Sequence, residues 1–334
     1  MADPWIEIAH RVVGGSVLVS IVGVQGSSPR EVGARMAVLS EAAVGSIGGG
    51  MLEYMAIQRA RTLLEQGATR HRLISFPLGP DTQQCCGGVV TLFFEPVTET
   101  VARAMGELKS HLESGALIAT CLGADRKQVF PTTDCRNDAW LEERDGQPWL
   151  IETAHRHRFT VALFGAGHVG SALVHALALQ SCRVLWFDPR PEQFPQRLPV
   201  QVRTDARENP ASAVPELPPG ALVLVMTHRH PLDYEICRSA LRRDDLGFVG
   251  LIGSASKRNR FAAQFRRDGL GEASIDRLVC PIGIPGIKGK EPPVIAASVV
   301  AQLLQVAERD QPAPEKRQGI SEAEADATPV ADAF

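Results

Sequence analysis

The sequence is poor in aromatic residues and carries no excess of positive charge. Aromatic residues make up 5% of its 334 residues, too few to stack the bases of a single-stranded nucleic acid along a surface. Its 35 basic and 38 acidic side chains leave a formal net charge of −3, so the positive field that attracts nucleic acids and anionic membranes is missing. We therefore expect no nucleic-acid partner and no membrane partner.

Long apolar runs are missing as well. The longest ones, such as residues 161–164 and 221–226, are far shorter than the ~20 residues of a transmembrane helix. Residues 1–10 lack the basic and apolar regions of a signal peptide. Seven cysteines are an odd number without the dense spacing of a disulfide framework, so we interpret them as reduced thiols. These features predict a cytoplasmic protein.

The length predicts two domains, at ~150 residues for each. Residues 1–130 mix strands and helices without strict alternation, which indicates a smaller mixed α/β domain. Its expected strands are 17–24, 35–39, 72–77, 89–96 and 116–122, and its expected helices are 5–13, 51–66 and 99–114. Residues 131–157 are polar and rich in turn residues, so we expect a linker there.

From residue 158 to 310 strands and helices alternate, which predicts a parallel sheet with helices on both faces. Expected strands are 160–164, 183–187, 221–227 and 247–252, and expected helices are 169–180, 232–243, 257–268 and 292–308. Residues 311–334 have almost nothing to bury, so we expect a disordered tail. The predicted fold class is α/β, with a C-terminal Rossmann-like domain and a smaller N-terminal domain.

Gly165, Gly167 and Gly170 form a Gly-x-Gly-x-x-Gly pattern around His168, between a strand and a helix. Such glycines let the backbone approach a phosphate at the helix N-terminus. Asp188, at the end of the next strand, stands where a ribose hydroxyl would bind. The pattern predicts a Rossmann-like unit, but it leaves open whether a dinucleotide occupies it, because glycines also permit close packing of helix on strand.

Cys85 and Cys86 are adjacent thiols in a polar loop beside glycines. A zinc clip spaces its cysteines by two or more residues, so we expect no structural zinc from this pair. Neighbouring thiols can instead bind a soft metal such as molybdenum or carry transferable sulfur. The alternative is a pair of small side chains packed under a turn.

The segment Gly45–Gly50 enters a predicted helix and is typical of a phosphate cradle, because successive amides and a helix N-terminus can hold an anion. An ordinary glycine-rich bend is the alternative. The candidate residues of this region, including two arginines upstream, are Ser46, Gly48, Gly49, Gly50, Arg30 and Arg35.

His228 and His230 follow the strand at 221–227 and would point the same way in extended backbone. They suit a metal pair or a proton-handling pair, and the alternative is capping of the next helix, with Asp233 nearby. No nucleophile elbow, Walker A loop or His-Glu-x-x-His motif occurs, so ordinary hydrolase and kinase functions lack support.

Taken together and in order, these motifs resemble the xanthine dehydrogenase accessory protein family, also called XdhC/CoxI, over nearly the whole chain. The segments that carry the resemblance are 26–30, 33–36, 45–53, 84–88, 164–170, 226–233, 250–260 and 281–291. The resemblance implies a molybdenum-cofactor chaperone and not an enzyme. It implies that the chain binds molybdopterin, protects it while a cysteine desulfurase supplies the terminal sulfur, and inserts it into xanthine dehydrogenase. It also implies a homodimer.

Carried over onto this sequence, the family resemblance makes Cys85 and Cys86 candidates for the metal and cofactor site, together with Gly45–Gly50, Arg30 and Arg35. A function of another class stays open. With an adenosine site at Gly165–Gly170 and Asp188, and with His168, His228 or His230 near a nicotinamide, the chain would be an NAD(P)-dependent oxidoreductase of a small substrate.

Overall fold

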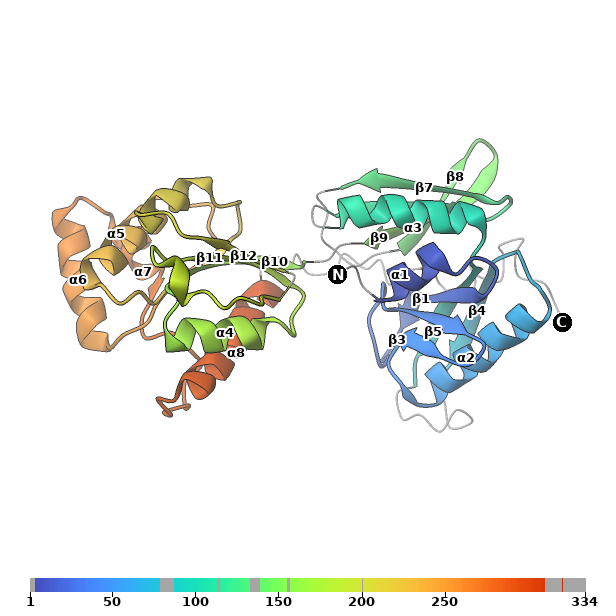
Figure 1. Cartoon of the computed structure of the whole chain (residues 1–334), viewed down its shortest axis with the longest axis horizontal. Helices are drawn as coiled ribbons and strands as arrows, with labels where there is room; N and C mark the ends of the chain where they lie inside the picture. Colours follow the sequence, from blue (N-terminus) through green and yellow to red (C-terminus); the bar gives the residue numbers. More distant parts are fainter. Residues whose placement is uncertain are drawn as a thin grey trace. The chain divides into compact units, whose positions relative to one another are not determined.

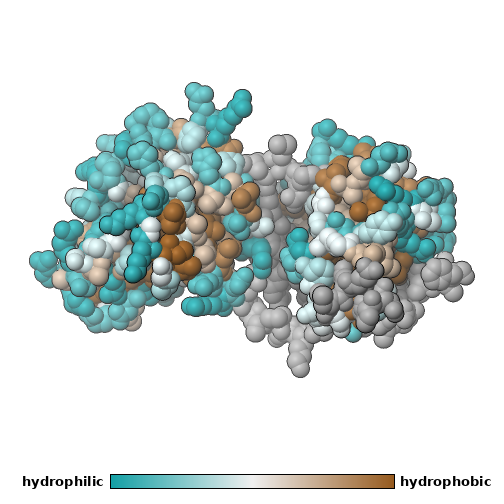
Figure 2. All heavy atoms as spheres, turned by 90° about the horizontal axis from the view of Figure 1, so that it is seen from below, coloured by the Kyte–Doolittle hydropathy of each residue, from teal (hydrophilic) through white to brown (hydrophobic). Residues whose placement is uncertain are grey.

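The chain forms two compact units in the computed structural model (Figure 1). The structure describes residues 4–78, 87–112, 115–132, 139–154, 157–199, 201–309 and 320. Unit 1 comprises Met1–Arg156 together with Pro314–Phe334, and unit 2 comprises His157–Ala313. In the view of Figure 2, apolar side chains form separate patches among hydrophilic ones on both units.

Unit 1 contains a five-stranded antiparallel sheet in the order β3-β2-β1-β5-β4. Its strands are β1 (Ser16–Gln25), β2 (Arg35–Leu39), β3 (Ala43–Gly45), β4 (Arg72–Pro77) and β5 (Val89–Pro96). Alternate residues of β1 contact different helices, because successive side chains of a strand point to opposite faces. Val17 packs with α2 (Gly50–Glu65), whereas Leu18 packs with α1 (Pro4–Arg11) and α3 (Glu99–His111). The sheet is therefore covered on both faces.

A second, four-stranded antiparallel sheet completes unit 1, in the order β7-β6-β9-β8. Its strands are β6 (Ala116–Cys121), β7 (Arg126–Pro131), β8 (Ala139–Arg144) and β9 (Gln147–Ala154). Residues 139–154 lie in the stretch that we expected to be a linker, and they form a β-hairpin instead. The turn residues Asp145 and Gly146, both at positive φ, mark the tip of that hairpin, and the sequence interpretation took them for irregular chain.

Unit 2 is the parallel, doubly wound sheet that the alternating pattern predicts. Its strand order is β12-β11-β10-β13-β14-β15. The strands are β10 (Phe159–Phe164), β11 (Cys182–Phe187), β12 (Val202–Asp205), β13 (Leu222–Val225), β14 (Phe248–Leu251) and β15 (Leu278–Val279). One apolar cluster joins the sheet to α5 (His230–Leu241), α6 (Ala255–Arg267) and α7 (Glu272–Asp276), and the other joins it to α4 (His168–Leu177) and α8 (Pro292–Arg309).

Short edge strands are what the sequence interpretation missed in unit 2. β15 has two residues, and β12 has four residues of which only Val202 is buried. Neither strand is long or apolar enough to show the alternation of apolar and polar residues that predicts a strand. Each longer strand and helix expected in residues 158–310 is present, with ends that differ by a few residues.

One residue beyond α8 belongs to a core. Ile320 is 1% exposed and lies in an apolar cluster of unit 1, which differs from the disordered tail that we expected over 311–334. The other residues of that stretch lie outside the described residues. A single apolar residue in a polar stretch carries no periodic signal. Among the helices that the structure describes, none has both the length and the apolar character needed to cross a membrane.

Candidate functional site

The turn at Gly45–Gly50 needs glycine for its shape. Gly48, Gly49 and Gly50 have φ values of 122°, 73° and 65°, in the region that residues with a side chain rarely adopt. α2 begins directly at Gly50. A Cβ added at Gly49 would meet nothing within 4 Å. The backbone at Gly49 therefore borders open space that a ligand can approach.

The donors of this turn already surround an anion, which is Glu53 of α2. Its Oε2 accepts hydrogen bonds from the Ser46 hydroxyl at 2.6 Å, from the Ile47 amide at 2.9 Å and from the Gly49 amide at 3.1 Å. Partial burial by itself would raise the pKa of Glu53, but these hydrogen bonds outweigh it and hold the pKa below its ordinary value of 4.5. The turn does gather donors around a negative charge, and the chain supplies that charge itself.

Arg30 lies against the turn. A Cβ built on Gly48 would be 2.6 Å from Cβ of Pro29 and 3.2 Å from Cγ of Arg30, so the turn touches the stem of the arginine. The Arg30 side chain is 44% exposed and forms an ion pair with its neighbour Glu31 at 3.3 Å. Its guanidinium is therefore accessible to a ligand that approaches the turn.

Arg35 is placed differently from Arg30. Its Nη2 is 3.0 Å from Oε1 of Glu152, and both side chains are buried. Its guanidinium also lies over the Trp5 ring, 5.3 Å from the centroid. Burial of Glu152 would raise the pKa of that carboxyl, but the charge of Arg35 opposes it and the pKa is lowered. Arg35 is thus engaged in the interior of unit 1, where its charge is compensated by Glu152.

A third loop closes on the segment that carries Arg30. Gly87 forms a parallel β-bridge with Ser27. A Cβ built on Gly88 would be 2.3 Å from the Ser27 carbonyl oxygen, and one built on Gly26 would be 3.2 Å from Cα of Gly88. Glycine is needed at these positions because the two backbones nearly touch. The structure therefore brings together the turn Gly45–Gly50, the segment Gly26–Arg30 and the pair Gly87-Gly88.

Cys85 and Cys86, the predicted metal and cofactor ligands, lie outside the described residues. The cysteines that the structure describes are buried thiols: Cys121, Cys182, Cys237 and Cys280. Burial raises the pKa of Cys182 to about 12, so such a thiol stays protonated and unreactive. Within the described part of the chain, no group of three or more His, Cys, Asp or Glu residues is arranged to hold a metal ion.

In unit 2, two of the three fingerprint glycines serve close packing. Gly165 has a φ of 118°, and a Cβ there would be 2.4 Å from the carbonyl oxygen of Met226. A Cβ on Gly170 would be 2.2 Å from the carbonyl oxygen of Gly165. Gly167 is exposed at the N-cap of α4, and a Cβ there would meet nothing within 4 Å. Only Gly167 leaves its backbone open to a ligand.

Asp188 is fully engaged within unit 2. Its Oδ2 accepts the Ala166 amide at 2.7 Å and Nη2 of Arg190 at 2.9 Å. Its Oδ1 accepts Nε of Arg190 at 2.9 Å and the Arg190 amide at 3.0 Å. Burial would raise the pKa of Asp188, but the Arg190 and Ala166 hydrogen bonds lower it. A carboxylate offers about four acceptor sites, and these bonds use them, so a ribose hydroxyl would have to displace one.

The predicted histidines of unit 2 lie at the edge where parallel sheets bind ligands. The strand order reverses between β10 and β13, and the contact of Gly165 with Met226 joins the loops that follow these two strands. His168 begins α4 after β10, and His228 and His230 follow β13. All three histidines are exposed. The structure thus brings the glycine fingerprint and the His-x-His pair to one edge.

Beneath His230 lies a buried charge network whose parts the sequence did not join. Asp233 is fully buried and accepts hydrogen bonds from the hydroxyl and amide of Thr227, at 2.7 and 3.0 Å. Nζ of Lys257 is 2.8 Å from Oδ2 of Asp233, whereas Nδ1 of His230 is 3.8 Å from it. Nζ of Lys257 also donates a hydrogen bond of 2.9 Å to the carbonyl oxygen of Ile252 in the loop before α6, and no local sequence pattern reveals these contacts.

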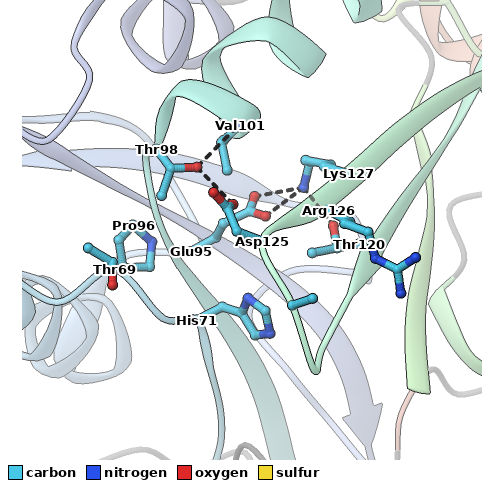
Figure 3. A pocket seen from close by; sticks show the side chains of 11 residues that line it. Thr69, His71, Glu95, Pro96, Thr98, Val101, Thr120, Asp125, Arg126 and Lys127 are labelled. Carbon is cyan, nitrogen blue, oxygen red and sulfur yellow. Dashed lines mark hydrogen bonds and ion pairs between the residues drawn. The ribbon is translucent and has the colours of Figure 1, made fainter. Parts of the chain in front are cut away.

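Unit 1 also contains a small polar cavity (Figure 3). Nζ of Lys127 lies 2.7 Å from Oε2 of Glu95 and 2.7 Å from Oγ1 of Thr120. Burial lowers the pKa of His71, which lines the same cavity. The cavity has a volume of about 10 Å³, which suffices for about one water molecule. It is too small for an organic cofactor.

Comparison with known families gives two matches along the chain. Residues 14–77 match the XdhC and CoxI family. Residues 161–303 match the XdhC Rossmann domain. The first match contains the turn Gly45–Gly50 and the segment Gly26–Arg30, and the second contains the fingerprint Gly165–Gly170 with the His-x-His pair.

Among curated proteins, the chain is 25% identical over 323 residues to a Bacillus subtilis protein named as a probable xanthine dehydrogenase subunit, covering 88% of this chain and 94% of the relative. It is 27% identical over 296 residues to the Escherichia coli uncharacterized protein YqeB, covering 86% of this chain. The chain spans 43% of the length of YqeB. A crystal structure from Bacillus halodurans, described as a xanthine dehydrogenase, superposes with a TM-score of 0.72 at 21% identity, covering 95% of this chain and 98% of that one. The last likeness shows that the two proteins share a fold.

Proposed function

Because the chain belongs to the XdhC and CoxI family, we propose that it is a molybdenum-cofactor chaperone. It binds the molybdopterin cofactor, holds it while a cysteine desulfurase exchanges its terminal ligand for sulfur, and inserts it into xanthine dehydrogenase. The Bacillus subtilis relative is named as a probable component of that enzyme, which supports the link. In this proposal the chain is an accessory protein that acts as a homodimer and catalyses no reaction of its own.

The observation that carries the proposal is the convergence of three loops in unit 1. Gly48 packs on Pro29 and Arg30, and Ser27 bridges to Gly87. Cys86 is bonded covalently to Gly87, and one residue of chain spans at most ~3.6 Å. Chain connectivity alone therefore attaches a thiol to the pair Gly87-Gly88, which contacts the same segment Gly26–Arg30 that packs on the glycine turn.

The residues present fit the chemical groups of the cofactor. Molybdopterin carries a phosphate, and Arg30 offers an exposed guanidinium beside the open backbone of Gly49. Its metal is held by two sulfur atoms and is soft, which suits a cysteine thiolate from Cys85 or Cys86. Glu53 limits where the phosphate can bind, because its carboxylate already accepts hydrogen bonds from the amides of Ile47 and Gly49. We therefore assign the phosphate to Arg30 and not to those two amides.

In this mechanism the chain binds and shields, and the cofactor supplies the molybdenum–sulfur chemistry when it is bound. Glu53 fixes the shape of the turn, because three hydrogen-bond donors of the turn bind to one of its carboxylate oxygens. Arg30 holds the anionic end of the ligand. Cys85 or Cys86 would hold the soft metal of the cofactor through a thiolate.

The test is to isolate the protein without oxygen and to measure bound pterin and molybdenum in the same sample. We expect about one pterin, detected by fluorescence after acid oxidation, for each bound molybdenum. The double variant Cys85→Ala/Cys86→Ala should retain at least tenfold less molybdenum. Cys121→Ala is the matched control, because it removes a buried thiol of the same unit and should leave retention unchanged. Undiminished molybdenum in the double variant would remove the thiols from the proposal.

An NAD(P)-dependent oxidoreductase remains the alternative function, and Asp188 weighs against it. The four hydrogen bonds to Ala166 and Arg190 leave this carboxylate no free acceptor site for a ribose. Titration of the purified protein with NADH and NADPH decides between the two functions. Micromolar binding with turnover of a small substrate would favour the oxidoreductase.

A further inference from the structure

A slot in unit 1 is filled by a residue from the far end of the chain. Ile320 is 1% exposed, and its amide donates a hydrogen bond of 2.9 Å to the carbonyl oxygen of Val22 in β1. Its apolar neighbours come from both sheets of the unit: Val22, Leu73, Phe93, Leu122, Ala139 and Leu150. The chain thus leaves unit 1 after Arg156 and contacts it again at Ile320.

The slot coincides with an irregularity in the sheet. The ladder between β1 and β5 pairs Ile21 with Leu92 and Gly23 with Thr91, so Val22 is skipped. Such a β-bulge leaves the backbone of the extra residue unpaired, and a buried unpaired carbonyl is costly. Ile320 supplies the missing donor. Its docking therefore satisfies a polar group and fills an apolar space at the same place.

Gly23 makes room for this contact. A Cβ at Gly23 would be 1.8 Å from the carbonyl oxygen of Ile320, a distance that no packing adjustment of a side chain can relieve. Gly23 is not among the glycines at positive φ, so its own backbone accepts any residue. Glycine weakens a strand interior, and here the close approach of Ile320 gives a reason for it.

We propose that unit 1 carries a docking slot for one apolar side chain with its backbone amide, and that its ligand is this chain's own C-terminal segment, held by Ile320. The slot also touches both ends of the loop that carries Arg30. Val22 lies three residues before the end of β1 at Gln25, and Val32, on the other side of that loop, packs against the same cluster. Docking of Ile320 therefore orders the loop. Its effect on cofactor retention rests on the proposed function, whereas the docking itself does not.

The experiment uses the full-length protein and two substitutions that attack the contact from opposite sides. Gly23→Ala inserts a methyl group into the path of the Ile320 carbonyl, and Ile320→Asp removes the apolar side chain. We expect each variant to raise amide hydrogen exchange about tenfold over residues 16–34. Because each substitution alone releases the C-terminal segment, amide exchange in the double variant should be no faster than in either single variant. The controls are Gly271→Ala, in open space, and Ile287→Asp, at a residue 45% exposed.

A peptide identifies the ligand. A synthetic peptide of residues 314–334, added in excess to the Ile320→Asp protein, should restore protection over residues 16–25, and the same peptide with Ile320→Asp should not. Unchanged exchange in both single variants, or additive effects in the double variant, would overturn the proposal. Loss of protection on dilution of the wild-type protein would overturn it too, since the ligand would then be the tail of a second copy.

Pterin content, measured on the same samples, separates the two proposals. If the wild-type protein carries no pterin, the proposed function fails, while the exchange data still decide the docking. If the wild-type protein carries pterin and docking is confirmed, Gly23→Ala and Ile320→Asp should each reduce pterin retention severalfold. Equal pterin retention in the wild type and in both variants would show that docking does not order the loop that binds the cofactor.

Discussion

Each unit places a carboxylate on the amides of a glycine turn, and the two units secure that carboxylate in different ways. In unit 1 the acid is Glu53, from the helix that the turn enters, and its partners are the Ser46 hydroxyl and the amides of Ile47 and Gly49. In unit 2 the acid is Asp188, from the end of the neighbouring strand. It takes one amide of the turn and a bidentate pair of bonds from Arg190.

The difference decides what each turn can offer a ligand. Arg190 neutralises Asp188 within unit 2, so that turn presents a paired, buried charge. The hydrogen bonds to Glu53 come from neutral donors, so the turn of unit 1 keeps a negative charge with the exposed Arg30 beside it. A glycine-rich turn in a sequence therefore does not reveal whether its amides are available. The acid that follows it along the chain must be examined as well.

The largest effect is expected where a glycine supports packing and not a ligand. Gly165→Ala forces a residue with a side chain to a φ of 118° and places its Cβ 2.4 Å from the Met226 carbonyl oxygen. We expect unit 2 to lose about 3 kcal/mol of its free energy of unfolding, measured by urea titration. Gly167→Ala is the matched control, since nothing lies within 4 Å, and it should cost less than about 0.5 kcal/mol. Equal losses would contradict the assignment of these two glycines to different roles.

Removal of the acid in unit 2 should have the next largest effect. Asp188→Ala leaves the Ala166 amide and the Arg190 guanidinium without their partner, and an uncompensated polar group in a buried place costs about 2 kcal/mol. Arg190→Ala should cost less, because Arg190 is 33% exposed and the Ala166 bond survives. Urea titration of both variants checks this order. A larger loss for Arg190→Ala would show that the arginine, and not the aspartate, organises the turn.

The sequence predicted strands and helices well where the hydrophobic pattern is long. The alternating strands and helices of residues 158–310 indicated the parallel sheet, and β1 was expected within one residue of its observed ends. The hairpin β8–β9 was missed because the stretch 131–157 is polar, and because Asp145 and Gly146 at the tip of the hairpin, both at positive φ, are turn residues that also suit a linker. Ile320 was missed because a single contact with a distant strand leaves no local pattern.

The sequence predicted the glycine turns of the candidate site, but it did not predict which residues pair with the charged side chains. The glycines of both turns are recognisable from spacing, since positive φ and close backbone approach demand them. The partners of the charged residues are not recognisable. Arg35 pairs with Glu152, which lies 117 residues away along the chain, and Lys257 pairs with Asp233, which lies 24 residues away. Such pairs depend on which elements the fold places side by side.

A smaller effect is expected for the acid of unit 1. Glu53→Gln keeps the size of the side chain and one carbonyl acceptor, but it removes the charge that strengthens three hydrogen bonds. We expect a loss of about 1 kcal/mol in the free energy of unfolding of unit 1, together with faster amide exchange at Ile47 and Gly49. Glu65→Gln, at the exposed end of the same helix, is the control and should change neither quantity. If the two variants behave alike, the charge of Glu53 does not hold the turn.

The smallest effect is a pH dependence that follows from the same contact. The pKa of Glu53 is lower in the folded chain than its ordinary value of 4.5, so the unfolded state binds the proton more readily than the folded state does. The stabilisation by ionised Glu53 is therefore complete above the unfolded pKa and is lost as the pH falls through the lowered folded pKa. Urea titrations of the wild type and Glu53→Gln at a series of pH values from neutral into acid should give curves that differ at the upper end and converge in acid. A difference that stays constant with pH would mean that shape, and not charge, fixes the turn.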